Sequence, residues 1–302
     1  MNTHHTNSNF LSAGEMCAGT LMLPVSVTLP PVVIMANGFG GTRKAALPDI
    51  ARHFVEDGYA VYIFDYRNFG DSDGQPRNWV SPRRHLADWA AAIKHVRQLP
   101  GVDKSSIVLW GTSFSGGHVI ETAAREQGIR AIIAQVPHVS GIASVLQAPL
   151  YVSFCLMFAA FIDQLGRIVK RPHYSRIVGH PGDVAALSSE ECWDGYAKLI
   201  PPGEIWENKV LSRIFFELPF YSPLRLARKI SVPTLIIAGK RDSVTPATAA
   251  FQAAMKIPNC EFHLLDGNHF ELHLASEAIC KKSINLQLAF LKKQIAAHQS
   301  SV

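Results

Sequence analysis

The feature that most constrains the fold is an alternation of short, continuous apolar runs with amphipathic segments. The runs read as buried strands, and they are Pro31–Ala36, Tyr59–Phe64, Ser106–Trp110 and Ala131–Gln135. Between them, apolar residues such as Leu47, Ile50 and Phe54 recur at helical spacing. Strands that are apolar on both faces are typical of parallel sheets covered by helices. The pattern therefore predicts a mostly parallel central sheet with helices on both faces.

The alternation stops near residue 138 and resumes near residue 222. The intervening stretch holds several prolines, few strand-like runs, and the aromatic-rich segments Tyr151–Phe161 and Phe215–Tyr221. Beyond it we predict strands at Val232–Ala238 and Glu261–Leu265 and helices at Ala247–Lys256 and Leu274–Ile295. A chain of 302 residues is long enough for one such core with an insertion. We expect an α/β core at residues 1–137 and 223–302, interrupted by a helical cap at 138–222.

Charge and cysteine usage exclude several classes of partner. The formal net charge is +5, but the basic residues are scattered, so no nucleic-acid partner is expected. The five cysteines are widely spaced without a CxxC pair, which argues against a disulfide framework or a zinc site. No Lys or Arg precedes Arg43, so the basic region of a secretory signal is missing. We expect a cytoplasmic protein.

A long apolar stretch runs from Ala131 to Ile162. A membrane-spanning helix needs about 20 continuous apolar residues. Pro137 and Pro149 interrupt the stretch near its middle. We therefore predict a buried strand followed by a separate apolar helix, and no membrane span.

The segment Val108–Val119, with the sequence VLWGTSFSGGHV, carries the strongest chemical signal. A buried strand runs into a sharp turn that is followed at once by a helix, and Ser113 lies at the turn. Such a turn exposes a serine hydroxyl above the sheet, and the helix N-terminus offers N–H groups to a developing oxyanion. Gly111 satisfies the need for a small residue before the turn, and Ser115 replaces the second glycine of G-x-S-x-G. The alternative is a plain loop with Ser113 as a helix cap.

Two later segments supply the partners of a nucleophilic serine. Asp242 follows a late apolar strand, and His269 lies in a glycine-containing loop after the next strand. The order Ser, Asp, His is that of the α/β-hydrolase triad, in which the carboxylate orients the imidazole. Asp266 is a rival acid, which we assign to shaping the turn because it follows the wrong strand. His118 lies inside the helix after Ser113, and we expect it to be structural.

Two glycine-rich turns lie near this predicted site. The first, Asn37–Gly41, follows a strand and brings backbone close to substrate, so we expect the Phe39 and Phe114 N–H groups to form the oxyanion hole. The second, Phe64–Gly74, is rich in carboxylates. We assign it a structural role, with Asp65 paired to Arg67, because its acids do not flank two histidines or further carboxylates as metal ligands would.

Four segments make most of the chain, from about residue 14 to 295, similar to a group of bacterial and fungal α/β-hydrolases. They are NGFGGTR at Asn37–Arg43, FDYRNFGDSDG at Phe64–Gly74, LWGTSFSGGH at Leu109–His118 and GNHFELH at Gly267–His273. The group resembles dienelactone-hydrolase and Xaa-Pro-peptidase relatives and includes fungal polyketide transferases and thiohydrolases. The resemblance implies a nucleophile at Ser113, a base at His269 and an acid at Asp242. It departs at Asn37, where the group usually has His.

These observations predict a serine hydrolase that cleaves an ester or thioester of a small hydrophobic acyl substrate without metal or cofactor. One alternative uses the same residues for acyl or polyketide transfer, or for thioester release from an acyl-carrier domain of a polyketide synthase. A second is a non-enzymatic binder on a hydrolase scaffold. A peptidase is a third, but no acidic pair is placed to hold a substrate α-amino group.

The insertion contains the most distinctive sequence. Tyr151–Ile162 has no polar face, so a helix there is expected to be covered on every side. Phe154, Phe158 and Phe161 recur at spacings that place them on one face. We predict that this face binds the acyl group of the substrate. The alternative is a helix that packs inside the cap or in a homodimer interface.

Overall fold

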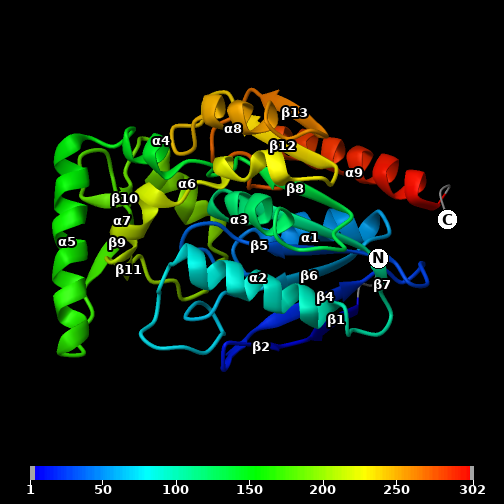
Figure 1. Ribbon diagram of the computed structural model, residues 1–302, viewed down its shortest axis with the longest axis horizontal. Helices are drawn as coiled ribbons and strands as arrows, with labels where there is room; N and C mark the ends of the chain where they lie inside the picture. Colours follow the sequence, from blue (N-terminus) through cyan, green and yellow to red (C-terminus); the bar gives the residue numbers. More distant parts are fainter. Residues whose placement is uncertain (1–3, 300–302) are drawn as a thin grey trace.

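The computed structural model describes residues 4–299 and is built on a central eight-stranded sheet (Figure 1). Its strands are β1 (His4–Asn7), β4 (Gly19–Leu23), β5 (Pro31–Ala36), β6 (Ala60–Phe64), β7 (Asp103–Thr112), β8 (Ala131–Gln135), β12 (Thr234–Gly239) and β13 (Cys260–Leu265). Their order across the sheet is β1-β4-β6-β5-β7-β8-β12-β13. β4 runs antiparallel to both of its neighbours, and the strands from β6 to β13 are parallel.

Helices cover both faces of the sheet, as the sequence predicts. α1 (Leu47–Glu56) and α9 (Ala278–Gln299) lie on one face, and α2 (Pro82–Val96), α3 (Phe114–Ala123) and α8 (Ala247–Ala254) lie on the other. Side chains alternate between the two layers along each strand. Val33 and Val108 pack under α1 and α9, whereas Ile34 and Leu109 pack under the other helices. Each central strand is therefore buried on both faces.

All six predicted strands of the core are observed, with boundaries that shift by at most a few residues. Pro31–Ala36 and Ala131–Gln135 coincide with β5 and β8, and Ser106–Trp110 lies within the longer β7. The predicted closing helix is α9, which begins at Ala278. Four N-terminal strands were not predicted: β1, β4 and a separate hairpin of β2 (Phe10–Ser12) and β3 (Glu15–Cys17). They are short and carry polar residues, so their apolar runs are weak.

The inserted segment forms a layer at one end of the sheet (Figure 1). Its helices are α4 (Gly141–Val145), α5 (Leu150–Ile168), α6 (Cys192–Leu199) and α7 (Ile214–Glu217). It also contains three short strands, β9 (Tyr174–Val178), β10 (Ala185–Leu187) and β11 (Val210–Leu211). These strands pair in the order β10-β9-β11, so the cap is not purely helical as the sequence suggested. The 3-10 turns η1 (Leu218–Phe220), η2 (Pro223–Arg225) and η3 (Ala227–Lys229) lead the chain back to the core.

The outer edge of the cap is formed by α5, which stands away from the central sheet (Figure 1). Val152, Leu156, Ala160 and Asp163 form its buried face. The Asp163 carboxylate accepts hydrogen bonds from Arg213 Nε at 2.7 Å and Nη2 at 2.9 Å. This buried ion pair fixes the inner face of α5 against the segment that begins α7.

The opposite face of α5 is apolar and exposed, which corrects the expectation that the helix is covered on every side. Phe154 is 75% exposed and Phe158 is 58% exposed. By length and composition alone α5 could cross a membrane, and 22% of its apolar window is buried. The prediction of no membrane span therefore stays a prediction.

Candidate active site

Ser113 lies at the tight turn between β7 and α3, where the sequence places it. Its φ of 56° is rare for a residue with a side chain, and such strain persists where the surroundings enforce it. A Cβ at Gly111 would come within 2.2 Å of the Ser115 carbonyl oxygen, so glycine is required there. Ser115 fits in place of the expected glycine because its buried hydroxyl hydrogen-bonds to Tyr66 Oη at 2.9 Å.

The fold brings Ser113, His269 and Asp242 together at the carboxyl ends of β7, β13 and β12. His269 Nε2 lies 3.0 Å from Ser113 Oγ, and His269 Nδ1 lies 2.8 Å from Asp242 Oδ2. Because the carboxylate can only accept at neutral pH, Nδ1 carries the proton and Nε2 is free to accept the serine proton. The geometry is that of a nucleophile, a base and an orienting acid.

The Asp242 carboxylate is almost fully buried and held in its ionised form. Its Oδ1 accepts hydrogen bonds from the N–H groups of Val244 at 2.8 Å and Thr245 at 2.7 Å. Burial alone would raise the pKa of Asp242, but the charge of His269 and the hydrogen bonds from His269 and Thr245 outweigh it and lower that pKa. The acid therefore stays negative and fixes the imidazole tautomer.

The rival residues are placed elsewhere. The Asp266 side chain is 76% exposed and pairs with Arg241 rather than with His269. His118 is buried, with Nδ1 2.6 Å from Tyr221 Oη and Nε2 3.2 Å from His85 Nδ1. It does not reach the cavity beside Ser113, in agreement with a structural role.

The backbone of the glycine-rich loop after β5 passes close to Ser113. A Cβ at Gly38 would lie 2.8 Å from Ser113 Cβ, so the loop backbone reaches the nucleophile because Gly38 has no side chain. The Asn37 side chain donates to the carbonyl oxygens of Thr42 and Ala45 at 2.6 Å, which fixes the loop. Phe39 and Phe114 both line the cavity next to Ser113. Their assignment as oxyanion donors stays a prediction.

The carboxylate-rich turn has the predicted structural role but different ion pairs. Asp65 pairs with Arg43, and Arg67 pairs with Asp88 of α2. The expected pairing of Asp65 with Arg67 is wrong, because the turn points the two side chains toward different neighbours. Across residues 4–296, no group of three or more metal-ligating side chains is gathered in one place.

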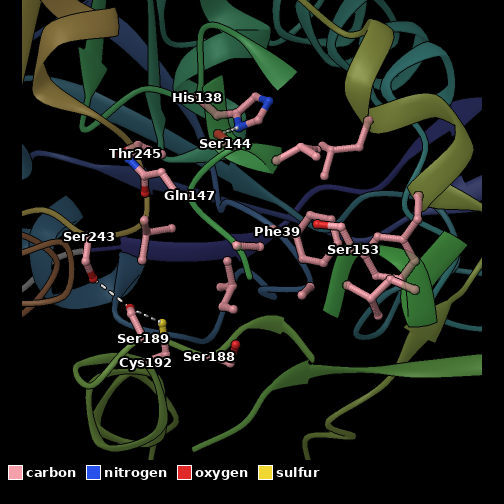
Figure 2. Close-up of a pocket in the computed structure, with 18 of the residues that line it drawn as sticks. Phe39, His138, Ser144, Gln147, Ser153, Ser188, Ser189, Cys192, Ser243 and Thr245 are labelled. Carbon is pink, nitrogen blue, oxygen red and sulfur yellow. Dashed lines mark hydrogen bonds between the residues drawn. The ribbon is translucent and has the colours of Figure 1, made fainter. Parts of the chain in front are cut away.

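A cavity of about 360 Å³ opens beside Ser113, between the core and the cap. Figure 2 shows Phe39 and Ser153 on one side of it and Thr245 and Ser243 on another. The cap contributes apolar walls from α5, namely Leu156 and Met157.

The three predicted substrate-binding phenylalanines do not line this cavity. Phe154, Phe158 and Phe161 are each at least half exposed on the outer face of α5, while Leu156 and Met157 of its inner side face the cavity. The helical spacing correctly puts the three rings on one face. It does not say which way that face points, and packing of Asp163 against Arg213 turns it outward.

Two histidines near the triad were missed by the sequence analysis. His273 Nδ1 donates to the His269 carbonyl oxygen at 2.8 Å, and its Nε2 lies 2.7 Å from Thr112 Oγ1. Burial lowers the pKa of His273 to about 3, so it is a neutral brace for the His269 loop. His138 lines the cavity, with Nδ1 3.0 Å from Ser144 Oγ (Figure 2). His273 ends the segment GNHFELH without a role that the sequence assigns to it, and His138 belongs to no quoted segment, so their spatial neighbours identify both.

The cap also contacts the loop that carries His269. Glu191, just before α6, accepts a hydrogen bond from the His269 N–H at 3.0 Å through Oε2. Its other oxygen accepts from the Ser243 N–H at 2.8 Å. One cap carboxylate thus joins the two core loops that carry His269 and Asp242.

Comparison with known proteins agrees with this architecture. The family model for the alpha/beta hydrolase fold matches residues 31–275. The chain is 36% identical over 286 residues to the quorum-quenching protein AidA of Acinetobacter baumannii, covering 94% of this chain and 93% of that protein. It is 26% identical over 273 residues to the polyketide transferase grgF of a Penicillium species, covering 88% and 89%.

The solved structures point the same way. The crystal structure of GrgF from Penicillium superposes with a TM-score of 0.82 at 24% identity, over 97% of this chain and 99% of that one. The structure of DcsB with a substrate analogue gives a TM-score of 0.83 at 21% identity, over 98% and 100%. At these identities the likeness concerns the fold. With a family match that spans the core and the cap, this chain belongs to the alpha/beta hydrolase family.

Proposed function

We propose that this protein is a serine hydrolase that cleaves an ester or thioester of a hydrophobic acyl substrate. The observation that carries the proposal is the hydrogen-bonded series Ser113–His269–Asp242 at the wall of a cavity. A serine with a base at 3.0 Å, and a base with a buried carboxylate at 2.8 Å, form an activated nucleophile.

The proposed reaction has two half-steps. Ser113 Oγ attacks the acyl carbonyl while His269 Nε2 takes the hydroxyl proton, and the N–H groups of Phe39 and Phe114 stabilise the oxyanion. The tetrahedral intermediate collapses, and His269 returns the proton to the departing alcohol or thiol. Water then attacks the acyl-enzyme with the same base, which releases the acid and restores Ser113.

The cavity supports an apolar acyl group. Its walls include the side chains of Phe114, Leu156, Met157 and Val244. About 360 Å³ falls in the range of small-molecule sites, roughly 300–1,000 Å³. A further space of about 30 Å³, lined by Ser113 and His269, is large enough to hold a water molecule.

Acyl transfer or thioester release from a carrier-bound polyketide is the alternative. It uses the same three residues, and the similarity to a polyketide transferase and to the thiohydrolase aneE of Aspergillus aculeatus favours it. The match to aneE is 38% identical over 107 residues and covers 34% of that protein. Product analysis with water alone and with an added alcohol separates the two: a transferase forms the new ester in preference to the acid.

The experiment that tests the proposal combines labelling with a substrate panel. A fluorophosphonate probe is expected to label the wild-type protein on Ser113, as located by peptide mass spectrometry, and Ser113→Ala is expected to remain unlabelled. The panel contains p-nitrophenyl esters, acyl thioesters and a lactone of increasing chain length. We expect faster turnover of medium-length apolar acyl groups than of acetyl.

Two results would contradict the proposal. Labelling that persists in Ser113→Ala would show that another residue is the nucleophile. A wild-type protein that neither reacts with the probe nor turns over any panel member, yet binds apolar acyl compounds, would be a binding protein on a hydrolase scaffold.

A further inference from the structure

The outer face of α5 is an apolar surface that the rest of the described chain leaves uncovered (Figure 1). We call it the α5 stripe. Its exposed members are Leu150, Phe154, Phe158, Phe161, Leu165 and Ile168. Their spacings of three and four residues place them along one side of the helix. The stripe therefore runs the whole length of α5 without a polar interruption.

The α5 stripe has a larger area than the apolar patches that monomeric proteins ordinarily expose. Each of the six side chains is at least half exposed, which amounts to roughly 700 Å² of apolar surface if a large side chain covers about 150–250 Å². The largest apolar patch on a typical monomer is about 300–600 Å². A stable dimer buries about 800 Å² on each partner. The stripe and its rim thus supply the area that one copy contributes to a dimer.

The distribution of charged residues along α5 is also compatible with a protein contact. Asp163 is the one charged residue between Leu150 and Leu165, and it is buried against Arg213 on the other side of the helix. Covering the stripe therefore removes no unpaired charge from water. Exposed basic residues, Arg167, Lys170 and Arg171, are confined to the C-terminal end of α5.

We propose that the α5 stripe packs against the α5 stripe of a second copy of this chain, around a two-fold axis near Phe158. Such an axis, perpendicular to the helix at its middle, makes the two helices antiparallel. Because 19 residues span about 28 Å at 1.5 Å per residue, the two basic ends then lie far apart. Each basic end then lies near the N-terminal end of the other copy's α5, where Asp183 is already paired with Arg176. Antiparallel pairing thus separates the two basic ends.

Analytical ultracentrifugation of the full chain tests the pairing. The wild type is expected to sediment as a dimer at micromolar concentration, and Phe158→Glu as a monomer, with dimerisation weakened about 100-fold or more because two carboxylates would be buried at the axis. Ile205→Glu is the matched control, since Ile205 is 92% exposed in the cap but outside α5, and it is expected to remain dimeric. Hydrolysis of a short ester by Phe158→Glu reports that the fold is intact.

Cysteine cross-linking tests the position of the axis. Phe158→Cys is expected to form an intermolecular disulfide under mild oxidation, because the two copies of residue 158 face each other. Ile168→Cys is the control, since its copies lie at opposite ends of the interface and stay beyond disulfide reach of about 7 Å between Cα atoms.

Three results would overturn the proposal. One is a monomeric wild type at high concentration. Another is a monomer that floats with anionic phosphatidylglycerol vesicles, which would assign the α5 stripe to a membrane surface. The last is a dimer that persists in Phe158→Glu or cross-links through Ile168→Cys alone.

Discussion

The central sheet and helix α5 of the cap differ in how far their apolar side chains are exposed. Every residue of β5 from Val32 to Ala36 is 0% exposed, because helices of the same chain cover both faces. On α5, Leu150 is 86% exposed and Phe154 is 75% exposed. The core is completed by its own chain, whereas the cap presents one apolar side to the cavity and another to the outside. Under the proposed function, the core carries the reacting residues and the cap supplies walls of the substrate cavity.

The largest expected effect lies in the core. Ser113→Ala removes the proposed nucleophile and is expected to lower kcat by on the order of 10⁶-fold, as the loss of the nucleophile does in a serine hydrolase. Ser115→Ala is expected to change kcat by less than about tenfold, because the Ser115 hydroxyl bonds to Tyr66 and not to His269. Initial rates on the best ester of the panel measure both. The opposite ranking would move the nucleophile to Ser115.

The second largest effect on kcat is expected at Asp242, the proposed acid. Asp242→Asn is expected to cost about 10³–10⁴-fold in kcat, because an amide favours the wrong imidazole tautomer. Asp266→Asn is the matched control: its side chain is exposed and pairs with Arg241, so little change is expected. If Asp266→Asn caused the larger loss, the geometry of the triad would not describe the working enzyme.

Within the cap, the two faces of α5 are expected to differ in stability. Asp163→Ala leaves the buried Arg213 without its partner, and breaking such a pair costs about 3–5 kcal/mol in the free energy of unfolding. Phe161→Ser, on the exposed face, is expected to lower the free energy of unfolding of the monomer by only about 1 kcal/mol, because the ring is half exposed. Urea unfolding of both variants in the Phe158→Glu background removes any contribution from dimerisation. Equal losses would mean that the outer face also packs within the monomer.

The smallest effect per residue is a pH dependence of stability, centred on the junction between core and cap. Burial lowers the pKa of His85 to about 3 and of His138 to about 4, and it also depresses the pKa of His118. The unfolded chain therefore binds more protons than the fold below the ordinary histidine pKa of about 6.5. Stability is fully present above that value and is lost as the pH falls toward 4. Each neutral histidine contributes up to about 1.4 kcal/mol per pH unit in this window.

Urea unfolding between pH 7.5 and 5 measures this slope, and His138→Phe is expected to reduce it. A stability that does not change across that range would mean that the buried histidines are protonated in the fold or exposed in solution.

Much of the core and its site could be read from the sequence because the signals are local. Val108–Val119 combines a buried strand, a glycine and a helix, which specifies the turn that carries Ser113. Asp242 and His269 each follow an apolar strand, and parallel strands place their carboxyl ends at one edge of the sheet. The positions of the three residues at strand ends therefore predicted that their side chains lie close together. In the structure His269 Nε2 lies 3.0 Å from Ser113 Oγ, and His269 Nδ1 lies 2.8 Å from Asp242 Oδ2.

The orientation of side chains and helix faces could not be predicted from local sequence patterns. Asp65 and Arg67 are neighbours in sequence, yet each pairs with a distant residue, Arg43 and Asp88. Helical spacing grouped Phe154, Phe158 and Phe161 on one face but could not orient it. A helix without a polar face carries no periodic signal that distinguishes inside from outside.

The sequence by itself thus determined the parallel sheet, the turn at Ser113 and the order of the three polar residues, because periodicity and turn chemistry act over a few neighbouring residues. The tertiary structure alone decided that α5 turns its phenylalanines outward and that His138 lies in the wall of the cavity. Both depend on the packing of segments far apart in the chain, such as Asp163 with Arg213 and the His138 loop with Ser113. Such packing follows from shape and partner geometry, which no local pattern encodes.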